Sequence, residues 1–354
     1  MAKMNTYRDD FQQVFCENLP WEKLSGTNIL ITGATGLIGS TLVEVLMSNP
    51  RRDYSVYASG RNTERAKKRF ESYLSMDSFH FVKYDVLLPL QNDVEFDYII
   101  HAASNASPNA FSKNPVEIIK ANICGVSNLM EYGLSHGMKR FLYVSSGEIY
   151  GESDGRVISE NYSGYVDCLS PRSCYPSSKR TAETLCASYA VEYGADIVIA
   201  RPCHIYGPNY TESDNRVYAQ FIRNILKGEN IILKSSGEQL RSWCYVVDCV
   251  SALLYILLKG KSGEAYNVAD SNSVLTIRQL AEMLAKIGKT KIIMDVPSET
   301  EKSSFNPVSK SVFSVDKLEK LDWKVSGDMN EKMRKTVEHL KSFYYDDFCN
   351  NTCL

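Results

Sequence analysis

A tyrosine and a lysine in Tyr175-Pro-Ser-Ser-Lys179 have the spacing of a proton-transfer pair. Side chains four residues apart lie on one face of a helix. A phenol with its reference pKa of ~10 is a poor base near neutral pH, and bringing that pKa to ~7 requires about 4 kcal/mol of preferential stabilisation of the phenolate. The lysine ammonium can supply part of this stabilisation. Such pairs also occur on solvated helix faces, so the prediction depends on neighbouring motifs.

Two serines lie upstream in Val144-Ser-Ser-Gly-Glu-Ile-Tyr-Gly151, at the end of an expected buried strand. Ser145 or Ser146 offers a hydroxyl group that can hold a reacting alcohol near Tyr175. Serine, tyrosine and lysine together predict acid–base chemistry on a substrate hydroxyl group.

A glycine-rich turn, Gly33-Ala-Thr-Gly36-Leu-Ile-Gly39, follows the first apolar run and opens a helical pattern. Glycines allow the backbone to approach a pyrophosphate, and the free N–H groups of the helix start neutralise its charge. Both flanks favour dinucleotide binding over a plain strand-to-helix turn. The contacts predicted from this turn are Gly33, Thr35, Gly36, Leu37, Ile38 and Gly39.

The second expected strand, Tyr54–Ala58, lacks the usual acidic residue that accepts a ribose 2′-hydroxyl; the sequence reads Ser59-Gly60-Arg61-Asn62 instead. Arg61 could pair with a 2′-phosphate, which favours NADP, or it could be a solvated residue that opens a basic helix. Asp85 and Val86, after the third expected strand, are placed to contact the adenine.

Short apolar runs alternate with amphipathic stretches as far as about residue 201, which predicts an α/β fold with a Rossmann-type, doubly wound parallel sheet. The later sequence has Gly/Pro/Asn-rich connections and two helical patterns, which suits a smaller, mostly C-terminal substrate-binding lobe. The expected organisation is a lead segment at 1–25, a dinucleotide-binding domain at 26–202, a lobe at 203–345 with some chain crossing back to the sheet, and a tail at 346–354.

Composition narrows the class of protein. The 354 residues include 40 Lys and Arg against 42 Asp and Glu, a net charge of -2 that gives no sign of nucleic-acid binding. The first residues lack a secretory-signal pattern, and no apolar run approaches about 20 residues, so we expect a cytoplasmic protein without a membrane span. The ten cysteines lack zinc-ligand spacing and are expected to be reduced thiols, with no metal site.

Taken together, these motifs resemble the extended short-chain dehydrogenase/reductase family of NAD(P)-dependent nucleotide-sugar epimerases, dehydratases and decarboxylases. The resemblance spans about residues 24–340. It rests on the glycine turn, Asp85-Val86, the serine pair, the Tyr175/Lys179 pair and three further motifs: His101-Ala-Ala103, Arg201-Pro-x-x-x-Tyr206-Gly-Pro208 and Arg241-Ser-Trp-Cys-Tyr-Val-Val-Asp248.

The resemblance implies roles for individual residues. Tyr175 would be the base that oxidises the sugar C4 hydroxyl, Lys179 would hold the nicotinamide ribose, and Ser146 would bridge the C4 hydroxyl and Tyr175. Arg241 would contact the substrate diphosphate, and a homodimer would form through helices near 115–133 and 177–193. Further implied cofactor contacts are Ala102, Ala103 and Ser104; further implied substrate contacts are Ser107, His204, Asn209 and Arg216.

Within this family the motifs are most similar to UDP-glucuronate decarboxylase, which oxidises C4, releases CO2 from the resulting β-keto acid and returns the hydride. Gly147 stands where 4,6-dehydratases have an Asp, which disfavours dehydration, whereas Glu148 matches a second catalytic acid and mildly disfavours a simple 4-epimerase. Phe111 and His204 depart from the tyrosine and asparagine of the decarboxylase pattern. A 4-epimerase and an NADPH-dependent 4-keto-sugar reductase therefore remain alternatives; a dehydratase or a non-catalytic regulator is less favoured.

Overall fold

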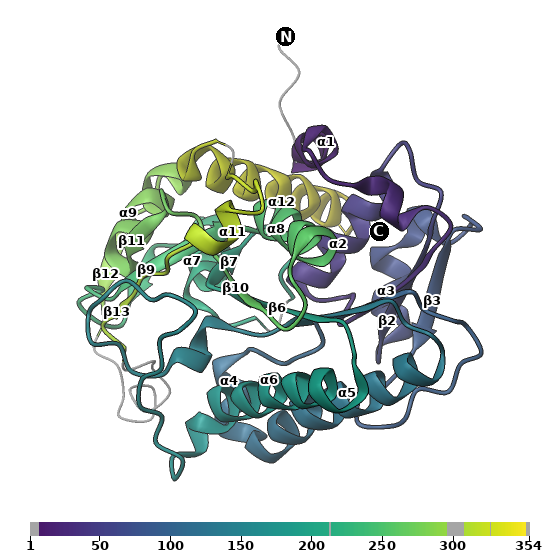
Figure 1. The fold of residues 1–354 in the computed structure, drawn as a ribbon. Helices are drawn as coiled ribbons and strands as arrows, with labels where there is room; N and C mark the ends of the chain where they lie inside the picture. The colour runs from purple at the N-terminus through teal and green to yellow at the C-terminus, as the bar shows by residue number, and fades with distance from the viewer. Residues whose placement is uncertain (1–6, 212–213, 296–307, 326, 352–354) are drawn as a thin grey trace.

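The computed structural model describes residues 7–211, 214–295, 308–325 and 327–351, with side chains as far as residue 342. In this part of the chain, seven parallel strands form one sheet in the order β10-β6-β5-β4-β1-β2-β3 (Figure 1). This confirms the expected α/β fold with a doubly wound parallel sheet. The strands are β1 Asn28–Thr32, β2 Ser55–Gly60, β3 Phe79–Lys83, β4 Tyr98–His101, β5 Arg140–Val144, β6 Ile197–Pro202 and β10 Ala265–Val268.

Helices cover both faces of the sheet (Figure 1). One face carries α4 (Pro108–Lys113), α5 (Pro115–Ser135) and α6 (Cys174–Tyr193); the other carries α2 (Leu37–Ser48), α8 (Val246–Lys259) and α12 (Met329–Asn351), with α3 (Thr63–Arg69) beside the edge strand β3. All residues of α8 from Val246 to Leu258 are buried, because this mostly apolar helix packs against α2 as well as the sheet.

The first described residues form the short helices η1 (Tyr7–Asp9), α1 (Asp10–Cys16) and η2 (Trp21–Leu24). They fall in the lead segment expected at 1–25, and Tyr7, Phe11 and Val14 belong to the main hydrophobic core. Asp10 is also buried, where it forms an ion pair of 2.7 Å with Lys335. The segment is therefore part of the folded domain, held by contacts with residues far away in sequence.

The lobe contains α7 (Val217–Leu226), α9 (Ile277–Gly288), α11 (Asp316–Glu319), β7 (His204–Tyr206), β8 (Ile231–Leu233), β9 (Leu240–Tyr245), β11 (Val274–Thr276), β12 (Ile292–Met294) and β13 (Lys310–Ser311). Strand β9 pairs with β7, β11 and β13, while β8 pairs with β12. Between these elements the chain returns to the main sheet as α8 and β10. The last helix continues to Asn351 and so includes most of the expected tail; residues 352–354 lie outside the described residues.

Within the described residues, no helix is both long enough and apolar enough to cross a membrane. The eight cysteines that the structure describes are free thiols. No cluster of three or more His, Cys, Asp or Glu suited to a metal ion occurs in the same part of the chain.

Candidate active site

The glycine turn joins β1 to α2 and packs tightly against the loop after β4. Gly33 has a φ of +67°, and a Cβ atom added there would lie 2.7 Å from the backbone of Ala102. A Cβ atom on Gly39 would overlap the carbonyl oxygen of Gly33. Side chains are thus excluded at both positions by conformation or close approach, and the turn leaves the N-terminus of α2 open to a ligand.

A cavity of about 830 Å³ lies beside this turn, at the carboxyl ends of the strands. The structure brings all the predicted cofactor contacts to its wall: Gly33, Thr35, Gly36, Leu37, Ile38, Gly39, Arg61, Asp85, Val86, Ala102, Ala103, Ser104, Tyr175 and Lys179. This position is where open parallel sheets bind dinucleotides.

The polar groups of this cavity fit a dinucleotide. The hydroxyl of Ser59, at the end of β2, is buried and has no hydrogen-bond partner among the described residues, so it is available to a ribose. Arg61, which the sequence offered as a 2′-phosphate ligand, lies 3.2 Å from Glu117, and both side chains are exposed. Asp85 accepts a hydrogen bond from the backbone N–H of Leu87 at 3.1 Å, which fixes its carboxylate at the wall.

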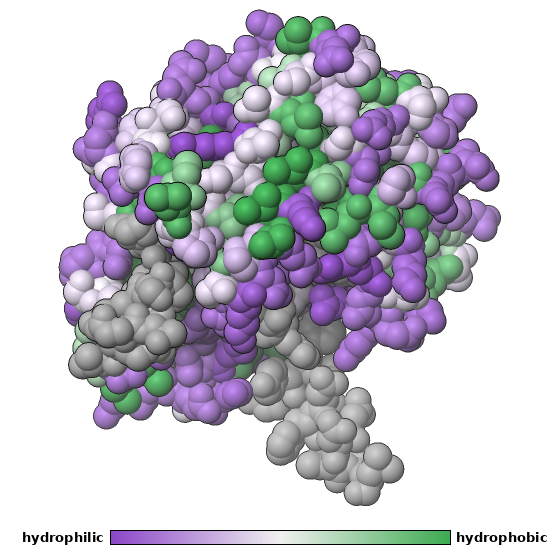
Figure 2. All heavy atoms as spheres, turned by 90° about the horizontal axis from the view of Figure 1, so that it is seen from below, coloured by the Kyte–Doolittle hydropathy of each residue, from purple (hydrophilic) through white to green (hydrophobic). Residues whose placement is uncertain are grey.

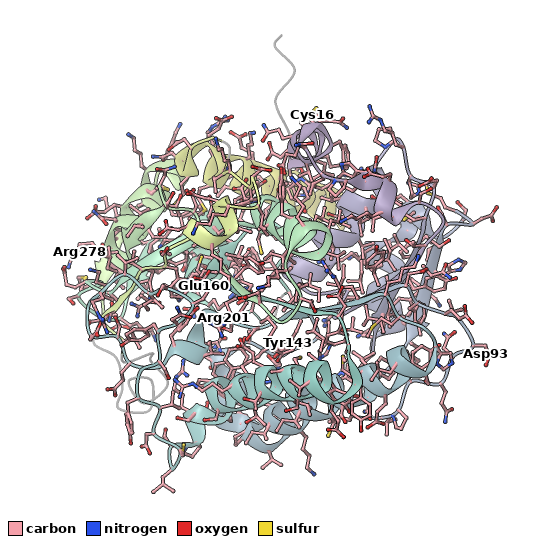
Figure 3. The ribbon with its side chains drawn as sticks, in the orientation of Figure 1. Cys16, Asp93, Tyr143, Glu160, Arg201 and Arg278 are labelled. Atoms are coloured by element: carbon pink, nitrogen blue, oxygen red, sulfur yellow. The ribbon has the colours of Figure 1, made fainter. Side chains whose placement is uncertain are left out.

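Tyr175 and Lys179 lie one turn apart on α6, both buried, where the helix crosses the end of β5. The Lys179 ammonium donates to the carbonyl oxygen of Val144 at 2.8 Å and lies 4.6 Å from the centre of the Tyr143 ring. Figure 3 shows Tyr143 between the sheet and the α5/α6 layer. A buried carbonyl and an aromatic face stabilise the cation here.

Burial raises the pKa of Tyr175 and lowers the pKa of Lys179, and each change disfavours the charged form of the side chain. Burial raises the pKa of Tyr175 to about 12, although a hydrogen bond with Ser146 opposes the change. It lowers the pKa of Lys179 to about 7, although Glu183 opposes that change. The lysine alone therefore does not make the phenol a base. A further positive charge next to Tyr175 is needed, and the oxidised nicotinamide of a bound cofactor would carry one.

The catalytic helix is anchored to the sheet by a buried ion pair. Arg201, at the end of β6, donates to Glu183 of α6 at 2.7 Å and to the carbonyl oxygen of Glu160, also at 2.7 Å (Figure 3). The two side chains are only 13% and 11% exposed, so removing one would leave an unpaired buried charge. This contact fixes the position of α6, and with it Tyr175 and Lys179.

A second cavity, of about 850 Å³, lies between the sheet and the lobe. Ser145 and Tyr175 line both cavities, so the two meet at the proposed base. The predicted residues that line the second cavity are Ser146, Glu148, Tyr175, His204, Arg216 and Arg241. The first cavity thus suits a cofactor and the second a substrate, with the serine and tyrosine between them.

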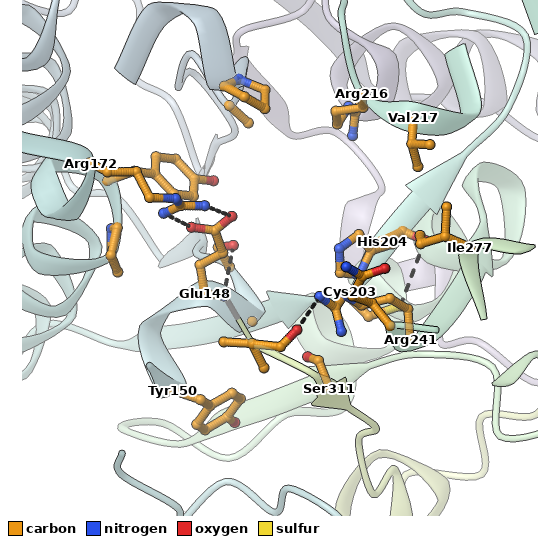
Figure 4. Close-up of a pocket in the computed structure, with 18 of the residues that line it drawn as sticks. Glu148, Tyr150, Arg172, Cys203, His204, Arg216, Val217, Arg241, Ile277 and Ser311 are labelled. Atoms are coloured by element: carbon orange, nitrogen blue, oxygen red, sulfur yellow. Dashed lines mark hydrogen bonds and ion pairs between the residues drawn. The ribbon is translucent and has the colours of Figure 1, made fainter. Parts of the chain in front are cut away.

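Charged side chains occupy opposite walls of the second cavity, with Arg172 and Glu148 on one wall and Arg241 on the other (Figure 4). Arg241 of β9 is buried and donates to the carbonyl oxygens of Leu240 and Ser309 at 3.0 and 3.3 Å. It forms no ion pair with a described carboxylate, and burial lowers its pKa to about 10, so it remains a cation at neutral pH. Arg216 is instead held by Asp214, which accepts from its Nε at 3.0 Å. Arg241 is therefore available to an anionic substrate group.

His204 of β7 lies beside Arg241 and packs against Trp243, with 5.3 Å between the ring centres. Burial lowers its pKa to about 3, and the nearby Arg241 and Arg216 add to this effect, so the ring is neutral. Its Nδ1 is buried without a partner among the described residues. The ring can exchange a hydrogen bond with a substrate, but it does not act as a cationic acid near neutral pH.

Glu148 is held by Arg172, whose two terminal nitrogens donate to the two carboxylate oxygens at 2.8 and 3.0 Å. The Arg172 guanidinium lies 5.4 Å from the centre of the Phe111 ring, and Phe111 stacks on Tyr175 with 4.8 Å between ring centres. No motif of the sequence indicates a role for Arg172. Its signal was weak, since a lone arginine three residues before a tyrosine is unremarkable until the fold shows what it contacts.

Two predicted substrate contacts lie elsewhere. Asn209 is buried outside both cavities, where its amide donates to the hydroxyl of Tyr7 at 2.9 Å and to Glu44 at 2.8 Å. It holds the N-terminal segment to α2 and does not face a ligand, so this expectation needs correcting. Ser107 lines the cofactor cavity and donates to Asn215 at 2.7 Å, which places it at the boundary and not in the substrate cavity.

Comparison with known proteins identifies the family. The chain matches the model of the NAD dependent epimerase/dehydratase family over residues 29–269. It is 35% identical over 279 residues to UDP-glucuronic acid decarboxylase 6 of Arabidopsis thaliana, across 78% of each protein. Its identity to UDP-glucuronic acid decarboxylase 1 of Xenopus tropicalis is 30% over 317 residues, 88% of this chain and 72% of that protein.

Among solved structures, UDP-glucose 4-epimerase of Thermotoga maritima, determined with UDP-glucose, superposes with a TM-score of 0.76 at 26% identity. The superposition covers 90% of this chain and 99% of that one. The chain belongs to the NAD dependent epimerase/dehydratase family.

Proposed function

We propose that this protein is a UDP-glucuronate decarboxylase: it oxidises the sugar at C4, releases CO2 and returns the hydride to C4. The observation that carries the proposal is the position of Tyr175, which lines both the cofactor cavity and the substrate cavity, with Ser146 in the wall of the substrate cavity. Only a sugar carbon at this junction can exchange a hydride with the cofactor and a proton with Tyr175. The similarity to decarboxylases from a plant and a frog supports the choice of substrate.

When bound, NAD would supply the hydride acceptor for the first half of the reaction and the hydride donor for the second. Ser146 and Tyr175 hold the C4 hydroxyl, and Tyr175 takes its proton as C4 is oxidised to a ketone. The ketone is β to the C6 carboxylate, so the C5–C6 bond breaks, CO2 leaves and the electron pair forms an enolate. A proton from solvent water then adds to C5, and Tyr175 would return its proton to the C4 oxygen as the ketone is reduced.

A glycine at position 147 supports decarboxylation over dehydration. A Cβ atom on Gly147 would overlap the ring of Phe313, so an aspartate there could not fit without moving that ring. A 4,6-dehydratase needs an acid to protonate the departing C6 oxygen, whereas loss of CO2 needs none. A 4-epimerase remains the second candidate, because the superposed Thermotoga enzyme has that activity in its name and a comparable fold.

We propose NAD as the cofactor. The family description supports NAD, and the ion pair between Arg61 and Glu117 occupies the group that would hold a 2′-phosphate. This contact weakens the argument for an NADPH-dependent reductase. An exposed pair contributes only about 0–1 kcal/mol, however, so a phosphate could displace Glu117, and the cofactor must be tested directly.

A homodimer is also part of the proposal. The face seen in Figure 2, which α4, α5 and α6 cover, carries exposed apolar side chains among polar ones. Val116 and Ile119 of α5 are 62% and 39% exposed, and Val191 and Tyr193 of α6 are 90% and 59% exposed. Two copies that pair these helices would bury such groups. We further propose a cytoplasmic location, which the free thiols of the described cysteines support.

The decisive experiment supplies UDP-glucuronate labelled at C6 to the purified protein with NAD+ or NADP+. We expect labelled CO2 and a UDP-pentose, with no net consumption of NAD+. Conversion of the uronic acid to its C4 epimer without CO2 would assign the epimerase instead. Stoichiometric oxidation of NADPH with a 4-keto sugar would assign the reductase.

A further inference from the structure

The ion pair between Arg172 and Glu148 lies at the wall of the substrate cavity beside the proposed base (Figure 4). It is partly buried, with side-chain exposures of 20% and 27%. Burial raises the pKa of Tyr175; Glu148 raises it further, while Arg216 and Arg172 lower it. These three charged groups are therefore close enough to the Tyr175 hydroxyl to act on it.

The geometry of the sugar places its C6 group near the same charges. If the C4 hydroxyl contacts Tyr175, then C6 is separated from C4 only by C5. Phe111, which stacks on Tyr175, offers the C6 group no polar atom. A carboxylate at C6 would gain most from the cations around Tyr175, because a buried charge without a partner is costly and bonds between charged groups are the strongest.

Of these cations, Arg172 has the most unused donors. A guanidinium group has five N–H donors, and the two hydrogen bonds to Glu148 use one donor at each terminal nitrogen. The Nε of Arg172 is buried and has no hydrogen-bond partner among the described residues. By contrast, Arg216 is held by the buried Asp214 through both its Nε and a terminal nitrogen and also contacts the Tyr218 hydroxyl.

Arg241 is a further cation that lines the cavity, but it stands on the opposite wall. Figure 4 shows Arg241 near His204 and Ser311, across the cavity from Arg172 and Glu148. Its donors already contact the carbonyl oxygens of Leu240 and Ser309. This position suits a diphosphate at the far end of the substrate, as the family resemblance implies, and leaves the sugar end to Arg172.

We propose that Arg172 determines specificity by binding the C6 carboxylate of the sugar, and that Glu148 holds the guanidinium in position in the absence of substrate. The inference rests on the proposed function and adds the residue that distinguishes a uronic acid from a neutral sugar. Glu148 and the incoming carboxylate then compete for one guanidinium group. A C6 hydroxymethyl group brings no charge and gains little from the same donors.

Opposite effects of the two partners test this role. Binding of UDP-glucuronate and UDP-glucose to the NAD-loaded enzyme is measured by calorimetry for the wild type, Arg172→Gln and Glu148→Gln. Arg156→Gln is the matched control, since Arg156 pairs with Asp154 in the same way but is 75% exposed and lies outside both cavities. Arg172→Lys keeps the positive charge but lacks the paired N–H donors of the guanidinium group. It replaces Arg172→Gln in the test if that variant does not fold.

We expect Arg172→Gln to lower the affinity for UDP-glucuronate about 10- to 100-fold, the range for losing a hydrogen bond to a charged group. The affinity for UDP-glucose should not change. Arg172→Lys should also lower the affinity for UDP-glucuronate and not that for UDP-glucose, but by a smaller factor than Arg172→Gln. Glu148→Gln should raise the affinity for UDP-glucuronate, because it removes the competing negative charge. Arg156→Gln should change neither affinity.

Equal losses for both sugars in Arg172→Gln, or a loss of UDP-glucuronate affinity in Glu148→Gln as large as in Arg172→Gln, would show that the pair has only a structural role and overturn the inference. Release of CO2 by the wild type is measured separately. Selective binding without CO2 release would reject the decarboxylase but retain Arg172 as the carboxylate ligand, whereas CO2 release without the selective loss would do the reverse.

Discussion

Replacing the buried lysine of the catalytic pair should make the protein more stable while it disables the site. Burial lowers the pKa of Lys179 to about 7 from an ordinary value of 10.5. A difference of this size means that keeping the charged lysine in the fold costs about 4–5 kcal/mol at pH 7. Lys179→Met removes this cost but leaves the carbonyl oxygen of Val144 without its donor, which offsets about 1–3 kcal/mol.

The pH dependence gives this prediction its sign. Between pH 7 and 10.5 the unfolded chain binds more protons at Lys179 than the folded chain does, so the wild type gains stability as the pH rises. The gain is about 1.4 kcal/mol per pH unit, or roughly 2 kcal/mol from pH 7 to pH 9 after allowing for partial deprotonation at pH 7. The advantage of Lys179→Met should shrink by that amount over the same interval.

The assay is unfolding by urea at several pH values between 7 and 9, without added cofactor. Lys67→Met is the control, because Lys67 is 58% exposed and pairs with Glu64 on the surface. Its difference from the wild type should not change across this interval. A Lys179→Met variant that is less stable than the wild type at pH 7, with a difference that does not change with pH, would refute the burial argument.

Three further predictions concern activity, binding and assembly. Tyr175→Phe should lower turnover by about 10²- to 10⁴-fold, the usual contribution of a general acid–base group, and leave the melting temperature nearly unchanged; near-normal turnover would remove Tyr175 from the base role. Gly39→Ala should lower both NAD+ affinity and stability, because its Cβ atom would overlap the turn. Equilibrium dialysis against NAD+ measures the affinity and a separate melting scan measures the stability. Wild-type values in both measurements would contradict the packing argument. Ile119→Glu should convert the proposed dimer to a monomer in light scattering, while Leu169→Glu, at a 94% exposed loop position, should not; a dimer in both would move the interface away from α5.

The sequence was informative wherever a local pattern decides the structure. The glycine turn lies between β1 and α2 because its glycines, its preceding apolar run and its following helical pattern are contiguous. The Tyr175/Lys179 pair lies on one helix face for the same local reason. All fourteen predicted cofactor contacts line a single cavity, since the ends of parallel strands meet at one edge of the sheet.

Features that depend on distant partners were not accessible from the sequence. Asn209 was expected at the substrate, but its partners Tyr7 and Glu44 are 202 and 165 residues away. The stabilisation of the Tyr175 phenolate was expected from Lys179 together with an oxidised nicotinamide; the fold adds that burial raises the pKa of Tyr175 to about 12 in the protein alone, which the sequence could not show. Arg172 lies just before α6 and Glu148 just after β5, so neither residue alone indicates that they form an ion pair.

Phe111 couples the proposed carboxylate ligand to the proposed base, because its ring contacts both the Arg172 guanidinium and the Tyr175 phenol. A change in the position of one of these side chains would therefore shift the other. A library that varies the sugar preference at Arg172 or Phe111 would therefore also disturb the base, and most of its members should be inactive. His204 lies on β7 and Arg241 on β9, two strands of the lobe, and Figure 4 shows both across the cavity from Arg172. Redesign of substrate range is best begun on that wall, where selectivity can change while the proton-transfer group stays in place.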